Sequence, residues 1–554
     1  MPLALSAFTH LWNAVGFPDQ APDDGTYIRR ALSVVDGLGP QQGSFYDHPY
    51  FGQMFLGTIF TIIGYPDLAI PSLPSTVQDL ELSVVTLYTI PRILMGILAL
   101  VDTFFIYKIA ERRYSRNVAF IAAILFAITP LGWLFRRMYL DPIQIPLLLT
   151  SILFALYSGT NTKTKTKTKA EQKSKSREIV NVRTGREEHE ELREREGQRQ
   201  GEGYGNYIGQ KIMSNQNIIL LLSSGIFLGL TIFTKIPAIT LIPLIGFIVF
   251  TNNKKNFKAL GIWIIPVILI PLIWPIHALS AGDFDQWQEG VLYQTTRISK
   301  PLFDAVNDFY NKDPVLLILG IAGFVFAAVI RKDFIFLFWV VPFLALFYVV
   351  DYVSHFHMIP LIPAFCIGAA VMISDLSDRI MKNKKLVHKV LPIAIISVIA
   401  IFGLVSTTSL IVKARNSSYF DVIALATEYL PKDDEMLNIA SASGGSATID
   451  SSEDEHVTII GTSRQFWIFQ YVFDKLGYDY KSPNNMVSKA MLRDASDGSE
   501  KILMIADENM RKIVTGEELP RTSKPEIKAE RISELYNGTK TVAKTHEVEI
   551  RTNY

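Results

Sequence analysis

Long runs of apolar residues without a formal charge recur along this chain and constrain its fold more than any other feature. Clear examples are 217–234 (NIILLLSSGIFLGLTIFT), 259–279 and 390–412. A helix that crosses the hydrocarbon core of a bilayer needs about 20 apolar residues. The repeated runs therefore predict a polytopic α-helical membrane protein.

The predicted number of membrane spans is about 11, at about 20 residues each. The first segment, 3–17, is short, so either the chain begins within a longer segment or this helix crosses a thinned part of the bilayer. The apolar segment 50–65 is expected to lie partly in the interface. The other predicted spans are 84–107, 118–137, 142–158, 217–234, 236–251, 259–279, 314–330, 334–352, 357–374 and 390–412.

The loops between the spans set the expected orientation. Alternate loops are rich in Lys and Arg, and such loops stay in the cytoplasm. We therefore expect an integral protein of the plasma membrane, with the loop 18–83, the loop 280–313 and the region 413–554 outside the cytoplasm. The Lys- and Arg-rich loops are 107–116, 160–215, 252–258, 331–333 and 377–389.

The organisation along the chain is a membrane core, 1–412, followed by a soluble region, 413–554. The insert 160–215 is highly charged and of low complexity, so it is expected to be a disordered cytoplasmic segment. In the soluble region, 456–463, 500–507 and 541–551 are typical of strands and 464–478 of a helix. These elements predict a C-terminal extracytoplasmic α/β domain.

Three further features bear on the partners, the disulfides and the location of the protein. The formal net charge is +1 and the charges lie in loops and tails, which gives no indication of a nucleic-acid partner. The single cysteine, Cys366, lies in an apolar run, so no disulfide forms within the chain. The triplets Asn416-Ser-Ser and Asn537-Gly-Thr are glycosylation sequons, which give weak support for an outer location.

Charged and histidine side chains gather on the predicted outer face, where cations should be scarce. Each residue alone could be an interfacial side chain or a helix cap, and the pair Asp23-Asp24 could be a solvated turn. Ionisable residues at membrane depth are costly and usually face a cavity or a substrate path. The set is Asp23, Asp24, Asp47, His48, Arg136, Arg137, Asp141, Lys235, His277, Arg297, Lys300, His355 and His357.

Cations and carboxylates on one face suit a lipid-linked sugar phosphate. Cleaving the sugar from the phosphate needs cations to stabilise the leaving charge. A carboxylate base must take the proton of the acceptor hydroxyl, whereas the phosphate leaves as an anion without a general acid. One aspartate and a clamp of Arg and Lys side chains would suffice.

The segment from Asp23 to Tyr65 resembles the first outer loop of the membrane glycosyltransferases of superfamily C. The closest groups are the protein O-mannosyltransferases and the lipid A aminoarabinose transferases. Their loop carries an Asp-Glu pair, a tyrosine and a proline-containing turn, which match Asp23-Asp24, Tyr27 and the turn at His48. The aspartate at Asp24 and the single proline in the turn are departures from the pattern.

Three further stretches resemble the same families in the same order, so that the resemblance extends over roughly 20–375. RRMYLDP matches the Arg and Asp at the head of a span and points to Arg137 and Asp141. FTKIP places Lys235 at an outer turn. HFHMIPLIP brings His355 and His357 to the start of a span.

The resemblance implies a glycosyltransferase that takes its sugar from a polyprenyl (dolichyl) phosphate, with a hexose, mannose first, as the expected sugar. It makes Asp23 the base of a single displacement and Asp24 its neighbour in the catalytic pair. The acceptor, which could be a protein, a glycan or a lipid, stays open, as does a divalent cation. The implied substrate-binding residues are Tyr27, His48, Arg136, Arg137, Asp141, Lys235, Arg297, His355 and His357.

The sequence also bears on four other functions. A glycosyltransferase acting on a lipid-linked glycan or a cell-surface polymer has nearly the same chemistry. A non-catalytic scaffold would be a degenerate enzyme of this type. A secondary transporter is disfavoured, because its charges would lie near the midplane in repeated halves. An oligosaccharyltransferase would be expected to carry a WWDYG element in its soluble region, and the sequence has none.

Overall fold

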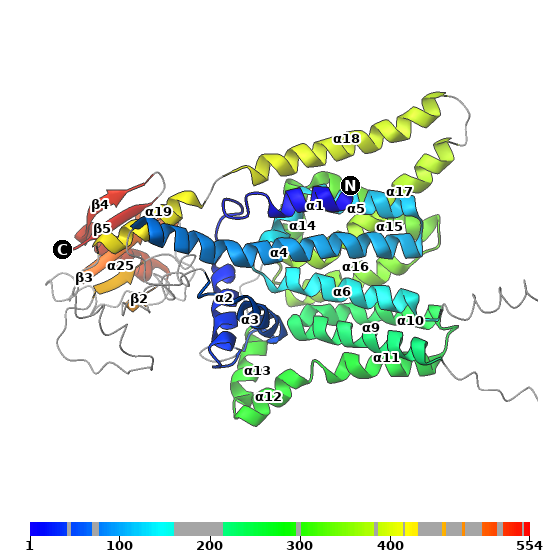
Figure 1. The fold of residues 1–554 in the computed structure, drawn as a ribbon, viewed down its shortest axis with the longest axis horizontal. Helices are drawn as coiled ribbons and strands as arrows, with labels where there is room; N and C mark the ends of the chain where they lie inside the picture. The colour runs from blue at the N-terminus through cyan, green and yellow to red at the C-terminus, as the bar shows by residue number, and fades with distance from the viewer. Residues whose placement is uncertain are drawn as a thin grey trace, which may run out of the picture.

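A computed structural model gives the fold: a long helical bundle with a small β-sheet beyond one end (Figure 1). We call that end of the bundle the sheet end. The predicted insert 160–215, apart from its last two residues, the predicted helix 464–478, Arg297 and Lys300 lie outside the described residues. Those described are 1–40, 46–68, 77–159, 214–294, 301–381, 386–413, 416–429, 457–460, 479–481, 501–517, 525–545 and 548–554.

Apolar helices build the bundle at the places that the sequence indicates. Glycines of α15 and α17 face each other closely, since a Cβ at Gly323 would clash with the backbone of Gly368. Small residues of this kind let two membrane helices approach closely. The bundle helices are α1 (Pro2–Leu11), α4 (Val77–Arg113), α5 (Arg116–Ile128), α6 (Leu140–Tyr157), α9 (Asn215–Thr234), α10 (Ile242–Asn252), α11 (Phe257–Leu269), α15 (Pro314–Val329), α16 (Ile335–Val350), α17 (Ile362–Met381) and α18 (Leu386–Ile411).

The chain is an integral membrane protein, because several of these helices are long and apolar enough to cross a bilayer. Within the described ranges, five helices pass this test, or up to seven if each bent pair is one span. Shorter apolar helices account for most of the other predicted spans, so the number of 11 stays a prediction.

The predicted span 118–137 is broken, and the break shapes the sheet end. Helix α5 ends at Ile128, and the 3-10 helix η1 (Pro130–Arg136) continues at an angle of 73°. Thr129 caps the new helix, with its Oγ1 accepting a hydrogen bond from the Leu131 backbone N–H at 3.3 Å. The bend brings Arg137 and the following extended residues toward the loop between α1 and α2.

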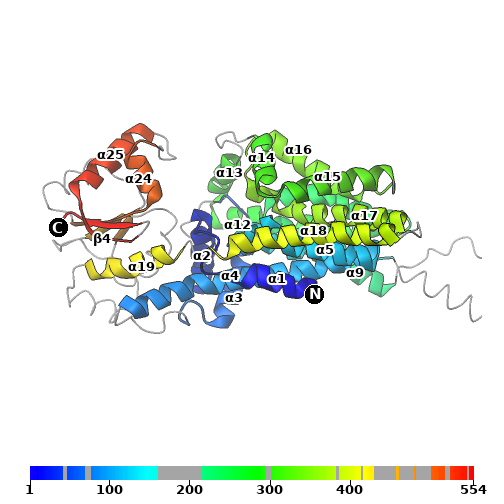
Figure 2. The same cartoon turned by 90° about the horizontal axis from the view of Figure 1, so that it is seen from above.

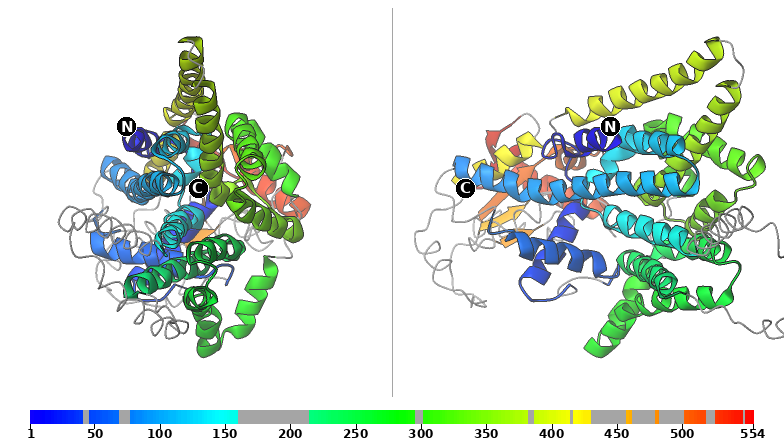
Figure 3. Two further views of the ribbon diagram at one scale, coloured as in Figure 1. Left: turned by 90° about the vertical axis from the view of Figure 1, so that its right-hand side faces the viewer. Right: turned by 45° about the vertical axis from the view of Figure 1, so that its right-hand side comes forward.

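Shorter helices cover the sheet end of the bundle. Helix α2 begins with Pro22, whose fixed φ suits the first turn, and its two aspartates stand in that turn. Helix α18 is inclined to the bundle and ends beside η1 and α1 (Figure 3). The covering elements are α2 (Pro22–Val35), α3 (Phe51–Ile63), α12 (Ile273–Ala281), α13 (Phe284–Tyr293), α14 (Leu302–Lys312), the 3-10 helix η2 (Ile236–Leu241) and the 3-10 helix η3 (His355–Leu361).

The C-terminal region forms a five-stranded mixed sheet of order β2-β1-β3-β5-β4. The strands β1 and β3 are parallel, whereas β5 is antiparallel to both β3 and β4. The single final strand predicted for 541–551 is wrong, because these residues form the hairpin of β4 and β5. The strands are β1 (Val457–Ile460), β2 (Asp479–Lys481), β3 (Lys501–Ala506), β4 (Lys540–Lys544) and β5 (Glu549–Thr552).

Helices lie on both faces of the sheet (Figure 2). The helices α24 (Glu508–Val514) and α25 (Pro525–Gly538) pack on one face. On the other face lies α19 (Ser417–Ala426), whose Phe420 belongs to the same apolar cluster as Leu503 of the sheet and Leu87 of α4. The core of the bundle is therefore continuous with that of the sheet through α19.

Candidate functional site

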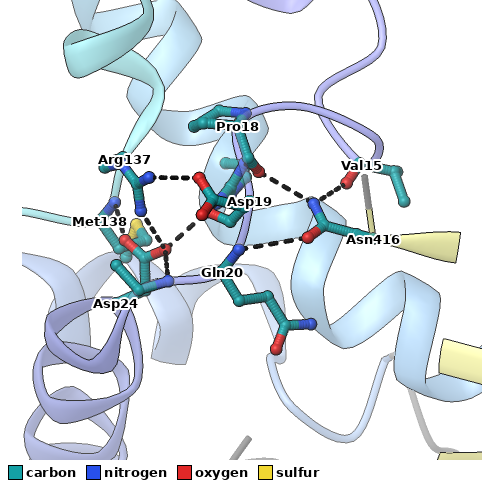
Figure 4. A network of polar contacts seen from close by, with 10 residues as sticks. Val15, Pro18, Asp19, Gln20, Asp24, Arg137, Met138 and Asn416 are labelled. Carbon is teal, nitrogen blue, oxygen red and sulfur yellow. Dashed lines mark hydrogen bonds and ion pairs between the residues drawn. The ribbon is translucent and has the colours of Figure 1, made fainter. Parts of the chain in front are cut away.

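The carboxylate of Asp24 is a buried structural group at the start of α2. Its Oδ2 accepts hydrogen bonds from the Ala21 backbone N–H at 3.2 Å and from the Arg92 Nη2 at 3.1 Å. Its Oδ1 accepts from the Met138 backbone N–H at 2.9 Å (Figure 4). The residue is 1% exposed, and its contact with Ala21 is half of a capping box. Asp24 therefore ties α2 to α4 and to the segment after η1.

Two arginines hold the loop that precedes α2. Arg92 donates from Nη1 to the Pro18 carbonyl at 2.6 Å and from Nη2 to the Asp19 carbonyl at 3.2 Å. Arg137 donates to the Asp19 carboxylate at 2.7 Å, and its Nη1 lies 3.8 Å from the Asp24 carboxylate (Figure 4). Two guanidinium groups thus face two carboxylates, and such pairing lowers the cost of burying charge.

Asp23 has a different environment from its neighbour, because successive residues of a helix point about 100° apart. It is partly exposed, whereas Asp24 is buried. One turn later stands Tyr27, and burial raises the pKa of its hydroxyl well above the ordinary value. The charges of Asp23, Asp47 and Asp141 raise this pKa further. The charges of carboxylates from α2, the turn at Asp47 and α6 therefore all act on the Tyr27 hydroxyl.

The turn at Asp47 and His48 is fixed to α2. Arg30 donates from Nη1 to the Asp47 carboxylate at 2.7 Å, and the rings of His48 and Tyr27 lie 6.5 Å apart. Gln294, the residue that follows α13, donates from its Nε2 to the Asp47 carbonyl at 3.2 Å. The predicted residues Tyr27 and His48 therefore lie together with Asp23.

The Arg30–Asp47 pair predicts a pH dependence of stability. Burial alone would raise the pKa of the Asp47 carboxyl, but the charges of His48 and Arg30 lower it below its ordinary value. A lowered pKa contributes stability above the ordinary value of about 4 and loses it as the pH falls through the folded value. The melting temperature in detergent should therefore fall from pH 5 to pH 3 more for the wild type than for Asp47→Asn. Equal decreases of the melting temperature in the two proteins would contradict a stabilising ion pair between Arg30 and Asp47.

Lys235 and Asp141 form a buried ion pair. The Lys235 Nζ lies 2.6 Å from the Asp141 Oδ2, and the side chains are 6% and 4% exposed. Gln144 fixes the turn, since its Nε2 donates to the Lys235 carbonyl at 2.9 Å. The ammonium group also lies 5.5 Å from the ring centroid of Phe356.

Aromatic rings connect this pair to Arg137. The Arg137 guanidinium lies 5.0 Å from the ring centroid of Trp133 and 5.8 Å from that of Tyr139. The ring of Tyr139 is in turn 5.3 Å from that of Phe356, beside which Lys235 lies. We call the rings of Trp133, Tyr139 and Phe356 the aromatic wall. Arg137 and Lys235, two of the predicted substrate-binding cations, lie at opposite sides of it.

The two predicted histidines of η3 have different surroundings. His355 is partly exposed, lies 5.9 Å ring to ring from Trp133, and its Nδ1 is 3.8 Å from the Asp308 carboxylate. His357 is buried, and its Nδ1 accepts a hydrogen bond from the Ser354 backbone N–H at 3.0 Å. His355 therefore lies beside the aromatic wall, whereas His357 caps its own 3-10 helix.

Arg136 points away from this group of residues. Its guanidinium is fully buried and donates from Nη2 to the Trp12 carbonyl at 2.5 Å, on the side of α1. Its Nε and Nη1 have no hydrogen-bond partner within the described part of the chain. His277 is also separate, because it lies 5.3 Å ring to ring from Tyr50 in the cluster formed with α12.

Three carboxylates at this site, those of Asp24, Asp47 and Asp141, are already engaged and are poorly placed to act as metal ligands. Asp47 and Asp141 are each paired with a cation, and Asp24 already accepts three hydrogen bonds. Over the residues that the structure describes, no group of three or more His, Cys, Asp or Glu side chains is placed to hold a metal ion.

Comparison with known proteins gives the fold but no sequence relative. No protein-family model and no curated protein sequence matches the chain. Among solved structures, the Archaeoglobus fulgidus oligosaccharyltransferase tethered with an acceptor peptide is 12% identical with a TM-score of 0.52, over 98% of this chain and 71% of that one. The oligosaccharyltransferase AglB from Archaeoglobus fulgidus, in complex with an inhibitory peptide and a dolichol-phosphate, is 13% identical with a TM-score of 0.51, over 93% of this chain and 69% of that one.

ArnT from Cupriavidus metallidurans bound to undecaprenyl phosphate is also similar, at 12% identity and a TM-score of 0.49, over 100% of this chain and 97% of that one. These structural neighbours are members of glycosyltransferase superfamily C. The likeness to the oligosaccharyltransferase structures shows that this chain shares their fold, in agreement with the fold expected from the sequence.

Proposed function

We propose that this protein transfers a hexose, with mannose as the first candidate, from a polyprenyl (dolichyl) phosphate to an acceptor hydroxyl. The observation that carries the proposal is the arrangement around Tyr27 and Tyr139. There a partly exposed carboxylate, Asp23, shares one end of a membrane bundle with the cations Arg137 and Lys235. The fold of superfamily C supports the same chemistry. The sheet end would face away from the cytoplasm.

The reaction would be a single displacement at the anomeric carbon of the donor. Asp23 would take the proton of the acceptor hydroxyl while the acceptor oxygen forms its bond to that carbon. The bond from the carbon to the phosphate oxygen breaks at the same time, and polyprenyl phosphate leaves with the electron pair. Attack from the face opposite the phosphate inverts the configuration of the sugar.

The cations would bind and stabilise the leaving phosphate. Lys235 is the first candidate, because its ammonium group lies at the aromatic wall and is paired with the Asp141 carboxylate. Arg137 and His355 stand further along the same wall and would contact the phosphate or the sugar. Tyr27 and His48 would line the side of Asp23. Arg297, which lies outside the described residues, stays a candidate from its sequence alone.

Asp24 would act as a positioning residue beside the base. Its three hydrogen bonds come from the residue before α2, from α4 and from the segment after η1, so it fixes the place where Asp23 stands. Arg136 would stabilise the packing of α1 and would not contact the phosphate, since its guanidinium is fully buried beside Trp12.

Binding of the lipid donor tests the proposed site. Lys235→Met is expected to weaken binding of radiolabelled polyprenyl phosphate mannose by about tenfold or more, because a charged hydrogen bond contributes about 1.5–3 kcal/mol. The double variant Lys235→Met/Asp141→Asn leaves no unpaired buried charge and should bind equally weakly while keeping its melting temperature. Lys258→Met, at the exposed start of α11, is the matched control and should bind normally.

Unchanged binding by a folded Lys235→Met variant would remove Lys235 from the phosphate site. A panel of polyprenyl phosphate glucose, polyprenyl phosphate mannose and a polyprenyl diphosphate glycan separates the donors. Selective binding of the glycan would favour the alternative of a lipid-glycan or surface-polymer glycosyltransferase.

A further inference from the structure

The side chain of Asn416 holds the loop that leads into α2. Its Nδ2 donates to the Val15 carbonyl at 2.7 Å and to the Pro18 carbonyl at 2.9 Å. Its Oδ1 accepts a hydrogen bond from the Gln20 backbone N–H at 3.2 Å (Figure 4). The residue is 0% exposed, so one carboxamide makes three hydrogen bonds to backbone groups of the loop in a buried setting, where each lost hydrogen bond is costly.

This contact joins directly to the network around Asp24. The Pro18 carbonyl accepts from both Asn416 and Arg92, and Arg92 also binds the Asp24 carboxylate. The next residue, Asp19, is bound by Arg137. Asn416 is therefore connected to Asp24, and so to the pair Asp23-Asp24, through the Pro18 carbonyl and Arg92.

Asn416 itself comes from the junction between the membrane bundle and the sheet. It follows α18 and directly precedes α19, whose Phe420 ring lies 5.3 Å from the Tyr88 ring of α4. Asn13 anchors the same junction, since its Nδ2 donates to the Ile411 carbonyl at 2.8 Å and to the Lys413 carbonyl at 3.0 Å. A displacement of α19 would therefore pull on the loop through Asn416.

We propose that Asn416 is a positioning residue, which fixes the loop of the base to the sheet-bearing junction. The inference rests on the proposed function, in which Asp23 is the base. It has a second consequence, because Asn416 begins a sequon. A glycan would have to be attached at the Nδ2 that donates two buried hydrogen bonds, so the sequon carries no glycan in the folded protein. The exposed Asn537 at the end of α25 has no such restriction.

The test compares Asn416→Ala with Ser418→Ala in the full-length protein. Both variants destroy the sequon, but only Asn416→Ala removes the carboxamide. Asn416→Ala is expected to speed amide hydrogen exchange at 15–24 by tenfold or more and to lower kcat about tenfold, with the donor Kd within twofold of the wild type. Ser418→Ala should match the wild type in both measurements. Asn416→Asp keeps the acceptor oxygen but not the two donors, so it should behave as Asn416→Ala.

Three results would overturn the inference. The first is unchanged hydrogen exchange at 15–24 in a folded Asn416→Ala variant. The second is an equal increase in hydrogen exchange and an equal decrease in kcat in Ser418→Ala, which would assign both changes to a glycan. The third is a glycan on Asn416 of the wild type by intact-mass and peptide analysis. If the wild type transfers no sugar, the proposed function fails, whereas the exchange and mass measurements still decide whether Asn416 holds the loop.

Discussion

Replacing Asp23 with asparagine is expected to lower kcat for sugar transfer by about 10²- to 10⁴-fold, the range for losing a general base. Asparagine has nearly the same shape but cannot take the proton of the acceptor hydroxyl. The donor Kd should stay within about twofold, because Arg137 and Lys235 are proposed to hold the phosphate. The measurement pairs single-turnover transfer with equilibrium donor binding in the same preparations.

Asp36→Asn is the matched control for this variant. Asp36 caps the opposite end of the same helix, α2, so its replacement removes a carboxylate from the helix without touching the site. It should retain transfer at the rate of the wild type. Transfer that survives in Asp23→Asn would reject Asp23 as the base and leave it as a favourable charge at the helix N-terminus.

Replacing Arg92 with methionine is expected to destabilise the protein by about 3–5 kcal/mol, the range for breaking a buried ion pair. Arg92 is 1% exposed, donates to two backbone carbonyls and to the Asp24 carboxylate, and lies 4.4 Å from the ring centroid of Tyr88. Methionine fills much of the volume but leaves the Asp24 charge buried without this partner. Chemical denaturation in detergent micelles measures the loss.

Arg331→Met serves as the control for losing an arginine ion pair. Arg331 binds Asp375 in a bidentate arrangement, but the two side chains are 34% and 18% exposed. Solvent screens such a pair, so the loss should be about 1 kcal/mol or less. Equal small losses in the two variants would show that the Asp24 network contributes little to stability.

The positions of the bundle helices could be predicted because each needs a long apolar run. The break at Pro130 is invisible to a hydropathy pattern, since the residues on both sides of it are apolar, although Thr129-Pro130 is itself a signal for the end of a helix. The angle depends on the packing of η1 against α1, α4 and α18. The hairpin in 541–551 could not be predicted either, because the polar residues between its two strands lie within a stretch that is strand-like as a whole.

The two acids at the start of α2 could have been distinguished from the sequence. Pro22 favours the first helical position, which makes Asp24 the third residue and a partner for the Ala21 backbone N–H. The other acid, Asp23, then points in a different direction and is partly exposed. Arg92 could also have been recognised from the sequence, since an arginine inside an apolar span requires a partner.

Other parts of the site depend on contacts between distant segments. Asn416 reaches back to the loop before α2, and Phe356 places Lys235 near Tyr139. No local pattern distinguishes such an asparagine from an ordinary sequon, or Arg136 from Arg137. The three-dimensional arrangement separates them, because the first arginine contacts Trp12 and the second Asp19.

The central claim is sugar transfer from a polyprenyl phosphate, and product formation by the wild type in liposomes tests it most directly. The vesicles would hold radiolabelled polyprenyl phosphate mannose or glucose, with a Ser/Thr-containing peptide, a glycoside and a hydroxylated lipid as acceptors. We expect labelled product together with an equal amount of free polyprenyl phosphate, and a rate about 10²- to 10⁴-fold lower for both in Asp23→Asn. Donors that bind the folded protein but yield no product with any acceptor would contradict the proposed transfer.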